Sequence, residues 1–227
     1  MKITVIGDIH GRSVFSYLPK LKKKDSQMLI FLGDYCDSFD ISNNDILFNL
    51  KKIIELKKKF PEKVILLLGN HDLQYFEPDF GKMSGYRSDM NISLKYLFEE
   101  NRKFFNLFFM YKKYLFSHAG ISFNWLKMNI KTINRHKEKN ENLVSVLEKM
   151  YKSSSGRNSL FQVGRIRGGF SKFGGPFWAD KRELETAPLK GIIQVVGHSS
   201  VSEITHSGTS VFCDCLHNTN EFYNLDI

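Results

Sequence analysis

The sequence predicts an α/β fold built on a parallel sheet, and two observations support this prediction. The first third of the chain alternates short apolar runs with segments of helical periodicity, the succession that forms strand–helix–strand crossovers. The apolar runs are also continuous, which is typical of parallel strands buried on both faces. The length of 227 residues fits one large domain, so we expect a single domain over residues 1–227.

Three apolar runs in the first third are expected to form the strands of this sheet. They are KITVIG at residues 2–7, MLIFLGD at residues 28–34 and KVILLLGN at residues 63–70. Between the first two runs we expect a short helix through Leu18 and Leu21.

A longer helix is expected over residues 43–60, because apolar side chains recur there at helical spacing. Asn43 or Asn44 can cap its start, and Pro61 stops it. The apolar stripe consists of Ile46, Leu47, Leu50, Ile53, Ile54 and Leu56.

The rest of the chain is expected to mix helices, strands and long loops. Residues 153–180 are rich in Gly and Ser and predict long loops, which in a compact domain are usually functional or mobile. The other expected elements are a helix that ends as a strand (92–111), two strands (113–120 and 191–199), a mostly helical stretch (124–151) and short antiparallel strands (201–225) with turns near residues 207–208 and 218–220.

The composition restricts the class of protein and its partners. The hydrophobic fraction of 42% is sufficient for a sizeable core, and no apolar run approaches the length of a membrane span. The start MKITVIGDIHG is interrupted by charge too early for a signal peptide. The net charge of +9 lies largely in short lysine runs. We interpret these runs as solvated helix faces, in preference to a surface that attracts anionic substrates or nucleic acid.

The cysteines indicate the redox environment. Cys36, Cys213 and Cys215 are few and odd in number, which does not suit a disulfide framework. They indicate a reducing compartment, and we therefore expect a cytoplasmic protein. The C-x-C spacing of the last two is a weak metal signal, so a structural role is the preferred interpretation.

Polar side chains follow five of the expected strands at the point where each strand ends. Ligands in open α/β sheets bind outside the carboxyl ends of the strands, so these side chains are expected to converge. Unrelated turns could explain any one of them, but not all five in one chain. The residues are Asp8 and His10 in GDIHG, Asp34 and Asp37 in GDYCD, Asn70, His71 and Asp72 in GNHD, His118 in SHAG, and His198 in GHS.

The donor atoms of these side chains indicate a metal site. Carboxylate and amide oxygens together with imidazole nitrogens suit Mn, Fe or Zn better than Mg or Ca. One carboxylate can supply the anion that two neighbouring cations share. The glycines of the motifs let the backbone turn sharply enough to bring such ligands close.

The ordered set GDIHG, GDYCD, GNHD, SHAG and GHS resembles the motif series of the calcineurin-like metallophosphoesterase superfamily, and it spans residues 7–199. The resemblance implies a four-layer α/β/β/α sandwich, in which two mixed sheets lie between helices. It also implies a centre of two divalent metal ions, for which Mn is expected and Fe or Zn are alternatives. The metal ligands that it implies are Asp8, His10, Asp34, Asn70, His118 and His198.

The same resemblance implies a role for individual residues in the reaction. Asp34 matches the carboxylate that bridges the two metals. His71 matches the histidine that protonates the leaving group, and Asp37 matches the carboxylate that orients this histidine. The implied reaction is direct hydrolysis by a water that bridges the metals, without a covalent phosphoenzyme.

Two departures from the superfamily pattern indicate the branch. Ser200 in GHSS stands where many phosphodiesterases and nucleases have a second histidine, which resembles the phosphoprotein phosphatases and the symmetrical dinucleoside-tetraphosphatases. Ser38 stands where these relatives usually have an arginine that clamps the phosphate, so another group must supply this contact or binding is weaker. Trp178, in a WAD segment that also resembles the phosphatase branch, is expected to serve packing. The candidates for binding the phosphate are Arg165, Arg167 and Arg12.

We therefore expect a metal-dependent phosphatase that hydrolyses phosphomonoesters, most like the serine/threonine phosphoprotein phosphatases. A dinucleoside-polyphosphate hydrolase uses the same motifs and is an alternative. A nuclease or cyclic-nucleotide phosphodiesterase fits the basic charge and the spelling GNHD, but GHSS counts against it. The presence of His71 and of every expected ligand counts against a non-catalytic binding module. The expected partner is a phosphorylated protein or a nucleotide; nucleic acid is not favoured, and no membrane is expected.

Overall fold

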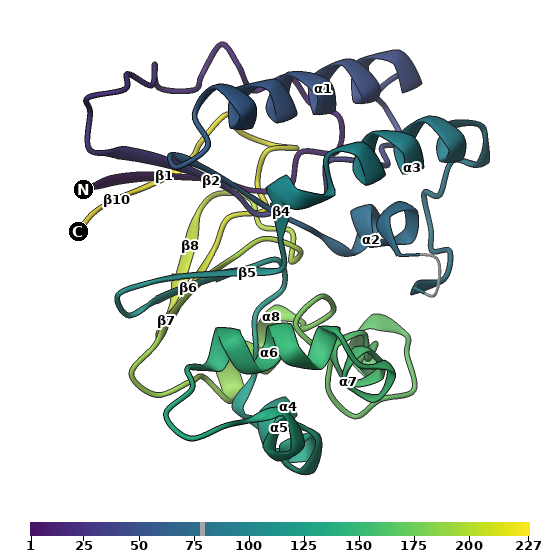
Figure 1. Ribbon diagram of the computed structural model, residues 1–227, viewed down its shortest axis with the longest axis vertical. Helices are drawn as coiled ribbons and strands as arrows, with labels where there is room; N and C mark the ends of the chain where they lie inside the picture. The colour runs from purple at the N-terminus through teal and green to yellow at the C-terminus, as the bar shows by residue number, and fades with distance from the viewer. Residues whose placement is uncertain (78–79) are drawn as a thin grey trace. The chain divides into compact units, whose positions relative to one another are not determined.

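The structure is a computed structural model that describes residues 1–77 and 80–227. The chain divides into two compact units. The first comprises residues 1–106, 201–204 and 213–227, and the second comprises residues 107–200 and 205–212. Each unit has its own sheet and its own helices (Figure 1).

The sheet of the first unit consists of β1 Lys2–Ile6, β2 Gln27–Phe31, β3 Val64–Leu67, β4 Phe105–Asn106 and β10 Tyr223–Asp226. The strands lie in the order β10-β1-β2-β3-β4. Strands β1 to β4 are parallel, and β10 is antiparallel to β1, so the sheet is mixed. The three strands predicted in the first third of the chain are confirmed as β1, β2 and β3, and their continuous apolar runs are buried.

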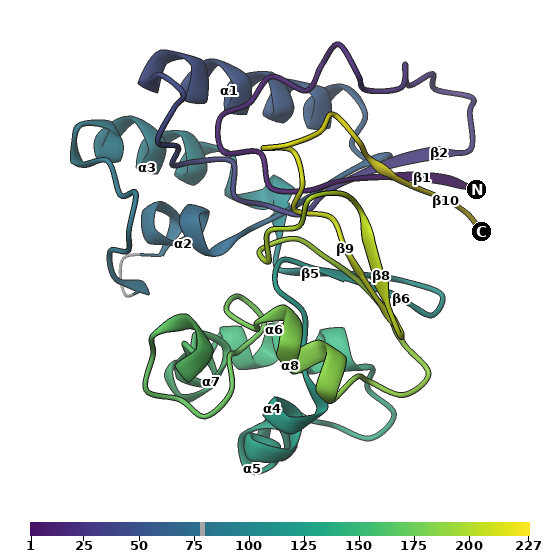
Figure 2. The ribbon, with the colours of Figure 1, turned by 180° about the vertical axis from the view of Figure 1, so that it is seen from behind.

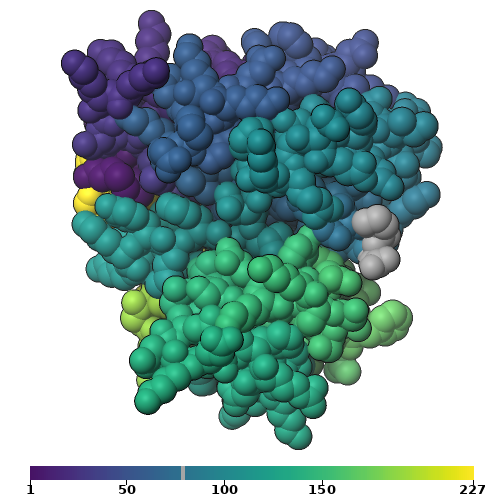
Figure 3. Space-filling model, viewed as in Figure 1, coloured from purple at the N-terminus to yellow at the C-terminus, as the bar shows by residue number. Residues whose placement is uncertain are grey.

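The α-helices of the first unit are α1 Asn43–Lys59, α2 Asn70–Phe76 and α3 Asn91–Glu100. Two 3-10 turns, η2 Ser88–Met90 and η3 Arg102–Phe104, flank α3. Helices α1 and α3 lie on the same side of the sheet in both ribbon views (Figures 1 and 2). On the face shown in the space-filling view, the blue and teal residues that include these two helices cover much of this unit (Figure 3).

The start of α1 differs from the prediction. Ser42 caps the helix, because its hydroxyl accepts a hydrogen bond from the amide of Asp45 at 3.2 Å, and Asn43 and Asn44 lie inside the first turn. The predicted end is confirmed, since the helix stops at Lys59, two residues before the proline. The core face of α1 buries four residues of the predicted stripe, namely Ile46, Leu50, Ile53 and Ile54.

The helix predicted through Leu18 and Leu21 is wrong, because this segment forms turns. The carbonyl of Val14 accepts hydrogen bonds from the amides of Tyr17 and Leu18. Pro19 follows directly and has no amide hydrogen to continue the pattern. A single turn is therefore the extent of helical bonding at this position.

The sheet of the second unit consists of β5 Phe108–Tyr111, β6 Tyr114–Ser117, β7 Ile193–Val196, β8 Thr205–Ser207 and β9 Ser210–Phe212. The strands lie in the order β5-β6-β7-β9-β8. The central pairs are parallel, and the two edge pairs are antiparallel, so this sheet is also mixed. The predicted strands within residues 113–120 and 191–199 are confirmed as β6 and β7.

The helices of the second unit are α4 Phe123–Met128, α5 Ile130–His136, α6 Leu143–Tyr151, α7 Ser154–Leu160, η4 Arg165–Arg167 and α8 Lys181–Thr186. The first three confirm the predicted helical stretch, and α6 packs against α5 and α7. Residues 153–180, predicted as long loops, also form α7 and η4, so the prediction is wrong for Ser154–Leu160 and Arg165–Arg167. Ser153 caps α7 by accepting a hydrogen bond from the amide of Gly156 at 3.1 Å.

These elements confirm the predicted α/β class, since both sheets are mixed and helices accompany each of them. All three cysteines are buried, and none forms a disulfide among the described residues. Within the described ranges, no helix combines the length and apolar character needed to cross a membrane.

Candidate functional site

The carboxyl ends of β1 and β2 bring three predicted metal ligands together. The two strands are parallel with Ile6 opposite Phe31, so the loops that follow them leave the same edge of the sheet. One ligand atom from each of Asp8, His10 and Asp34 lies within 4.8 Å of the other two. Asp8 and Asp34 are each only 2% exposed.

Main-chain hydrogen bonds hold these two loops against each other. The amides of Ile9 and His10 donate to the carbonyl of Asp34 at 3.1 and 2.7 Å, and the amide of Gly11 donates to Tyr35 at 3.0 Å. His10 and Asp34 both have left-handed backbone, with φ of 44° and 49°. Residues other than glycine rarely adopt this conformation, and it persists where the surrounding structure imposes it.

Two glycines permit the close approach of the loops after β2 and β3. A Cβ on Gly33 would lie 2.3 Å from the amide nitrogen of Gly69. A Cβ on Gly69 would lie 2.1 Å from Oδ1 of Asp34. Both separations are far shorter than van der Waals contact, so no side chain fits at either position.

The hydrogen bonds of His10 leave one ring nitrogen for a metal. Nδ1 donates to the carbonyls of Asp37 at 2.7 Å and Cys36 at 3.1 Å. Nε2 lies 3.8 Å from Oδ2 of Asp34. Metal-ligating histidines commonly donate their other ring N–H to a carbonyl or carboxylate. This nitrogen and the carboxylates of Asp8 and Asp34 are a donor set that fits a divalent transition-metal ion.

Helix α2 places Asn70 and His71 beside this group. The side-chain amide of Asn70, which is 1% exposed, donates to Sδ of Met83 at 3.1 Å. The backbone amide of His71 donates to Oδ1 of Asp34 at 2.9 Å. The rings of His10 and His71 meet edge to face, with 5.3 Å between centroids. Asn70 and His71, two further predicted site residues, therefore follow the carboxyl end of β3, the parallel neighbour of β2.

His71 and Asp37, predicted as the general acid and its orienting carboxylate, form an ion pair. Nδ1 of His71 lies 3.0 Å from Oδ2 of Asp37, which is 3% exposed and has a left-handed φ of 56°. Burial lowers the pKa of His71, but the charges of Asp34 and Asp37 and the hydrogen bond to Asp37 outweigh this and raise the pKa to about 9.

Asp72, to which the sequence assigned no role, holds the loop that follows β2. Its fully buried carboxylate accepts hydrogen bonds from the amides of Tyr35 at 2.8 Å, Cys36 at 3.2 Å and Gly69 at 2.9 Å. Burial and the nearby charge of Asp34 raise the pKa of Asp72, although the three hydrogen bonds oppose the rise. The final letter of GNHD was the available signal, but it does not identify which distant loop the carboxylate binds.

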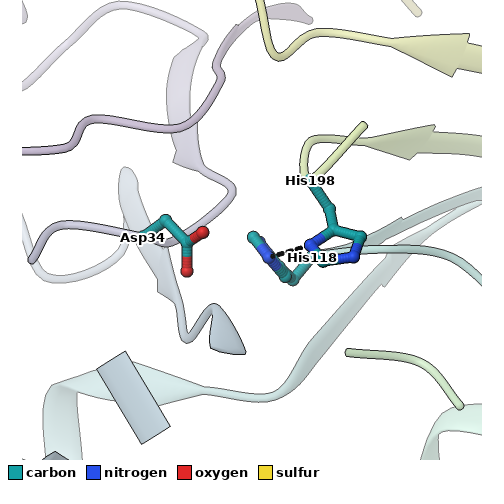
Figure 4. A group of neighbouring side chains, drawn as sticks. All are labelled: Asp34, His118 and His198. Carbon is teal, nitrogen blue, oxygen red and sulfur yellow. Dashed lines mark hydrogen bonds between the residues drawn. The ribbon is translucent and has the colours of Figure 1, made fainter. Parts of the chain in front are cut away.

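The second unit presents His118 and His198 at the ends of neighbouring parallel strands. His118 directly follows β6, and His198 follows β7. Nε2 of His118 lies 3.2 Å from Nδ1 of His198, a contact drawn as a dashed line in Figure 4. His118 is fully buried, and His198 has a left-handed φ of 62°. These two predicted ligands thus lie together within their unit.

The three arginines predicted to bind phosphate have different surroundings. Arg12 in the first unit pairs with Asp40 at 3.5 Å. In the second unit, Nε of Arg167 lies 3.0 Å from Oδ2 of Asp180. Arg165 is exposed on η4. Two of the three candidates are therefore already matched with a carboxylate.

Arg167 also contacts the loop that carries His198. Its Nη2 donates to Oγ of Ser199 at 2.7 Å and lies 3.5 Å from the carbonyl of His198. Burial raises the pKa of Asp180, but its bonds to Arg182 and the charge of Arg167 lower it overall. The half-buried ring of Trp178 packs perpendicular to His198 with 5.6 Å between centroids, so this side chain packs against a predicted ligand.

Residues 1–215 match the calcineurin-like phosphoesterase family. The chain therefore belongs to this family, and the resemblance inferred from the five motifs is confirmed. The family comprises hydrolases that act on phosphoesters and use divalent metal ions. The grouping of Asp8, His10 and Asp34 supplies suitable donors for such an ion.

Two curated relatives match shorter parts of the chain. A probable serine/threonine-protein phosphatase of Encephalitozoon cuniculi is 34% identical over 104 residues, which cover 44% of this chain and 20% of that protein. The catalytic subunit of serine/threonine-protein phosphatase 6 of Drosophila melanogaster is 32% identical over 83 residues, which cover 35% of this chain and 25% of that protein. The matches thus span a fifth to a quarter of these relatives.

The fold extends beyond these matched segments. A cold-active protein-tyrosine phosphatase from a psychrophilic Shewanella species has a solved structure with a TM-score of 0.61 to this chain. The two chains are 17% identical, and the match covers 99% of this chain and 75% of the other. At this identity the likeness shows a shared fold.

Proposed function

We propose that the protein is a metal-dependent phosphatase that hydrolyses phosphomonoesters. The observation that supports this most directly is the grouping of Asp8, His10 and Asp34 at two strand ends, with the pair of His71 and Asp37 beside it. Donors for a divalent cation thus lie next to a histidine that can donate a proton. This combination suits direct hydrolysis of a phosphoester.

Two divalent ions are proposed, with Mn preferred and Fe or Zn as alternatives. When bound, the ions supply Lewis-acid polarisation of the phosphoryl group and lower the pKa of water. Asp34 would be the ligand shared by both ions, as the family pattern implies. The remaining proposed ligands are Asp8 and His10 for the first ion, and Asn70, His118 and His198 for the second.

His71 is proposed as the general acid. Its Nδ1 is held by Asp37 at 3.0 Å, so the ring presents Nε2 as the atom that donates the proton. The proton passes from Nε2 to the oxygen of the departing alcohol, which then leaves as a neutral molecule instead of an alkoxide. Asp37 keeps the ring in this orientation and stays a carboxylate.

Arg12, Arg165 and Arg167 are proposed to bind the phosphate, because Ser38 occupies the position of the usual arginine. Of the three residues, Arg165 is exposed, whereas Arg12 and Arg167 are half-buried. Arg12 and Arg167 would keep their aspartate partners and contribute further N–H donors from the same planar group.

Phosphoserine and phosphothreonine in proteins are the proposed substrates. Ser200 in place of a second histidine supports this branch, and both curated relatives carry names of serine/threonine phosphatases. Dinucleoside polyphosphates are the alternative, because enzymes that cleave them share the motif set. We also propose that residues 1–227 act as one domain in the cytoplasm.

The proposed chemistry can be tested with nitrophenyl phosphate and bis(nitrophenyl) phosphate. We expect the monoester to be the better substrate, turnover to disappear on chelation, and Mn to restore it. Full activity in rigorously metal-free protein would contradict the proposal, and so would a preference for the diester.

A second assay identifies the substrate class. Peptides that carry phosphoserine, phosphothreonine or phosphotyrosine are compared with a dinucleoside tetraphosphate under the same metal conditions. We expect the highest kcat/KM on phosphoserine or phosphothreonine. A higher value on the dinucleoside tetraphosphate would replace the proposed substrate class with the alternative.

A further inference from the structure

Among the residues that the structure describes, three side chains contact the carboxylate of Asp37, although the family pattern accounts for one. Besides His71, its Oδ2 accepts a hydrogen bond from Nε2 of Gln74, and its Oδ1 accepts one from the hydroxyl of Tyr75 at 2.6 Å. Gln74 and Tyr75 are buried, as is Asp37 itself. A carboxylate held at both oxygens by three donors cannot rotate without breaking hydrogen bonds that water does not replace.

The spacing on α2 explains why one carboxylate reaches all three donors. His71, Gln74 and Tyr75 stand at positions i, i+3 and i+4 of the helix, which places their side chains on the same face. Asp37, on the loop after β2, lies against this face. The helix therefore holds the orienting carboxylate and the proposed general acid in one rigid frame.

Residues 83–87, which we call the 83–87 segment, fix Gln74 and Tyr75 from the other side. Oε1 of Gln74 accepts a hydrogen bond from the amide of Met83 at 3.0 Å. The hydroxyl of Tyr75 accepts one from the amide of Arg87 at 2.9 Å while it donates to Asp37. Each side chain thus has one polar partner in the segment and one on the carboxylate.

The same segment packs directly on the acid–carboxylate pair. A Cβ on Gly85 would lie 3.4 Å from Cβ of Asp37 and 3.8 Å from Cε1 of His71, and the backbone there has a φ of +83°. The ring of Tyr86 stacks on Tyr75 with 5.2 Å between centroids and 15° between planes. The 83–87 segment therefore packs against Asp37 and His71 and also forms hydrogen bonds with the two residues that hold Asp37.

We propose that Gln74 and Tyr75 are positioning residues for proton donation by His71, and that the 83–87 segment holds them in place. They act through Asp37: with both donors present the carboxylate keeps the plane that aligns Nδ1 of His71, and hence the direction of Nε2. This inference rests on the proposed function, in which His71 is the general acid. According to this inference, Gln74 and Tyr75 affect protonation of the leaving group and do not affect metal binding.

The test uses Tyr75→Phe, which removes one hydroxyl and keeps the stacked ring. We expect kcat on a phosphoserine peptide to fall about tenfold, the loss expected for one aligning hydrogen bond, with KM and metal content unchanged. Nitrophenyl phosphate needs little protonation of its leaving group, so its kcat should fall less than about threefold. The control is Tyr96→Phe, which removes the same hydroxyl from a tyrosine that is 65% exposed on α3.

Gln74→Met supplies an independent variant, since it removes the other donor while it keeps the length of the side chain. We expect the same selective loss on the phosphoserine peptide. If Tyr75→Phe does not fold, the result for Gln74→Met decides. Equal losses on both substrates, loss of metal, or unchanged kcat on the phosphoserine peptide would overturn the inference.

His71→Asn separates a failure of this inference from a failure of the proposed function. If His71→Asn lowers kcat equally on both substrates with its metals intact, His71 is not the general acid, and the proposed function fails at that step. If His71→Asn shows the leaving-group dependence and the Tyr75 and Gln74 variants do not, then only their positioning role is wrong.

Discussion

The two units hold their candidate ligands by different means. In the first unit, main-chain hydrogen bonds from Ile9 and His10 to Asp34 join two loops, and Gly33 and Gly69 leave no room for side chains between loops. These constraints are part of the backbone and disappear only if the fold changes. The first unit should therefore tolerate very little change at its strand ends.

The loop of His198 in the second unit depends instead on side chains. Arg167 donates to Ser199 and pairs with Asp180, and Trp178 packs against the imidazole. These side-chain contacts, which we call the His198 brace, can be removed one side chain at a time while the sheet stays intact. The comparison indicates that a change to the joined loop backbones of the first unit disrupts its ligands as a group, whereas removal of single side chains around His198 gives a graded response.

The largest effect is expected at Asp34, where one substitution removes a charge from the most constrained loop. Asp34→Asn should lose metal and lower turnover by about 10³-fold or more, because several kcal/mol of Lewis-acid stabilisation depend on the ions. Metal analysis together with the nitrophenyl phosphate assay measures both. Asp25→Asn, at an exposed turn, is the control. Normal turnover with two ions per chain would show that Asp34 is not a shared ligand.

A slightly smaller effect is expected for His71, whose neighbour Asn70 is assigned to the metal. His71→Asn should retain both ions and lose roughly 10²–10⁴-fold in kcat on a phosphoserine peptide, the usual range for general acid catalysis. Asn70→Ala should instead lower the metal content. Asp37→Asn should give a milder form of the His71 defect, because it orients the imidazole without donating the proton. Metal loss in the His71 variant would contradict this separation.

The close contact of the loops after β2 and β3 predicts an effect on stability. Gly69→Ala should lower the free energy of unfolding by about 3 kcal/mol, because the new Cβ would meet Oδ1 of Asp34 at 2.1 Å. Gly191→Ala serves as the matched case in the second unit: its Cβ meets nothing within 4 Å, but its φ of +74° costs about 1 kcal/mol. Urea denaturation measures the free energy of unfolding of both variants. Equal losses would show that the loops of the first unit are no more sensitive to an added side chain than this turn of the second unit.

The smallest effect is expected for Arg167, and it distinguishes two roles. If this side chain braces the His198 loop, Arg167→Ala should weaken metal affinity by about 10–100-fold, as for other groups that orient a ligand. If it binds phosphate instead, KM should rise while metal affinity stays constant. Arg182→Ala is the control, because Arg182 also pairs with Asp180 but is largely exposed. Unchanged metal affinity in Arg167→Ala would show that the second unit does not depend on this brace.

The strands and the residues that follow them could be predicted because their signals are local. A continuous apolar run followed by Gly-Asp or Gly-Asn marks both the strand and the polar residue at its end, as at Asp8, Asp34 and Asn70. The match of residues 1–215 to the calcineurin-like phosphoesterase family confirms the class of protein that these motifs indicate. Periodicity likewise located α1, although the choice of Ser42 as the cap depends on backbone angles that adjacent asparagines do not reveal.

The supports of the site could not be predicted, because they depend on contacts between distant segments. Gln74 and Tyr75 follow the GNHD motif as ordinary helix residues, and only the fold shows that both reach Asp37. Asp72 binds amides 36 and 37 residues earlier in the chain, including Tyr35. The pairing of Arg167 with Asp180 is equally invisible in a single sequence, where both fall in a stretch predicted as loop.

The bonded amides between the loops after β1 and β2 also make the site observable without a substrate. Loop amides usually exchange quickly with deuterated water, but those of Ile9, His10 and Gly11 are hydrogen-bonded and can exchange only when the two loops separate. The exchange rates of these amides therefore report how readily the two loops separate. A ligand that binds the closed loops should slow these amides in proportion to its occupancy, so the same three signals report both assembly and binding.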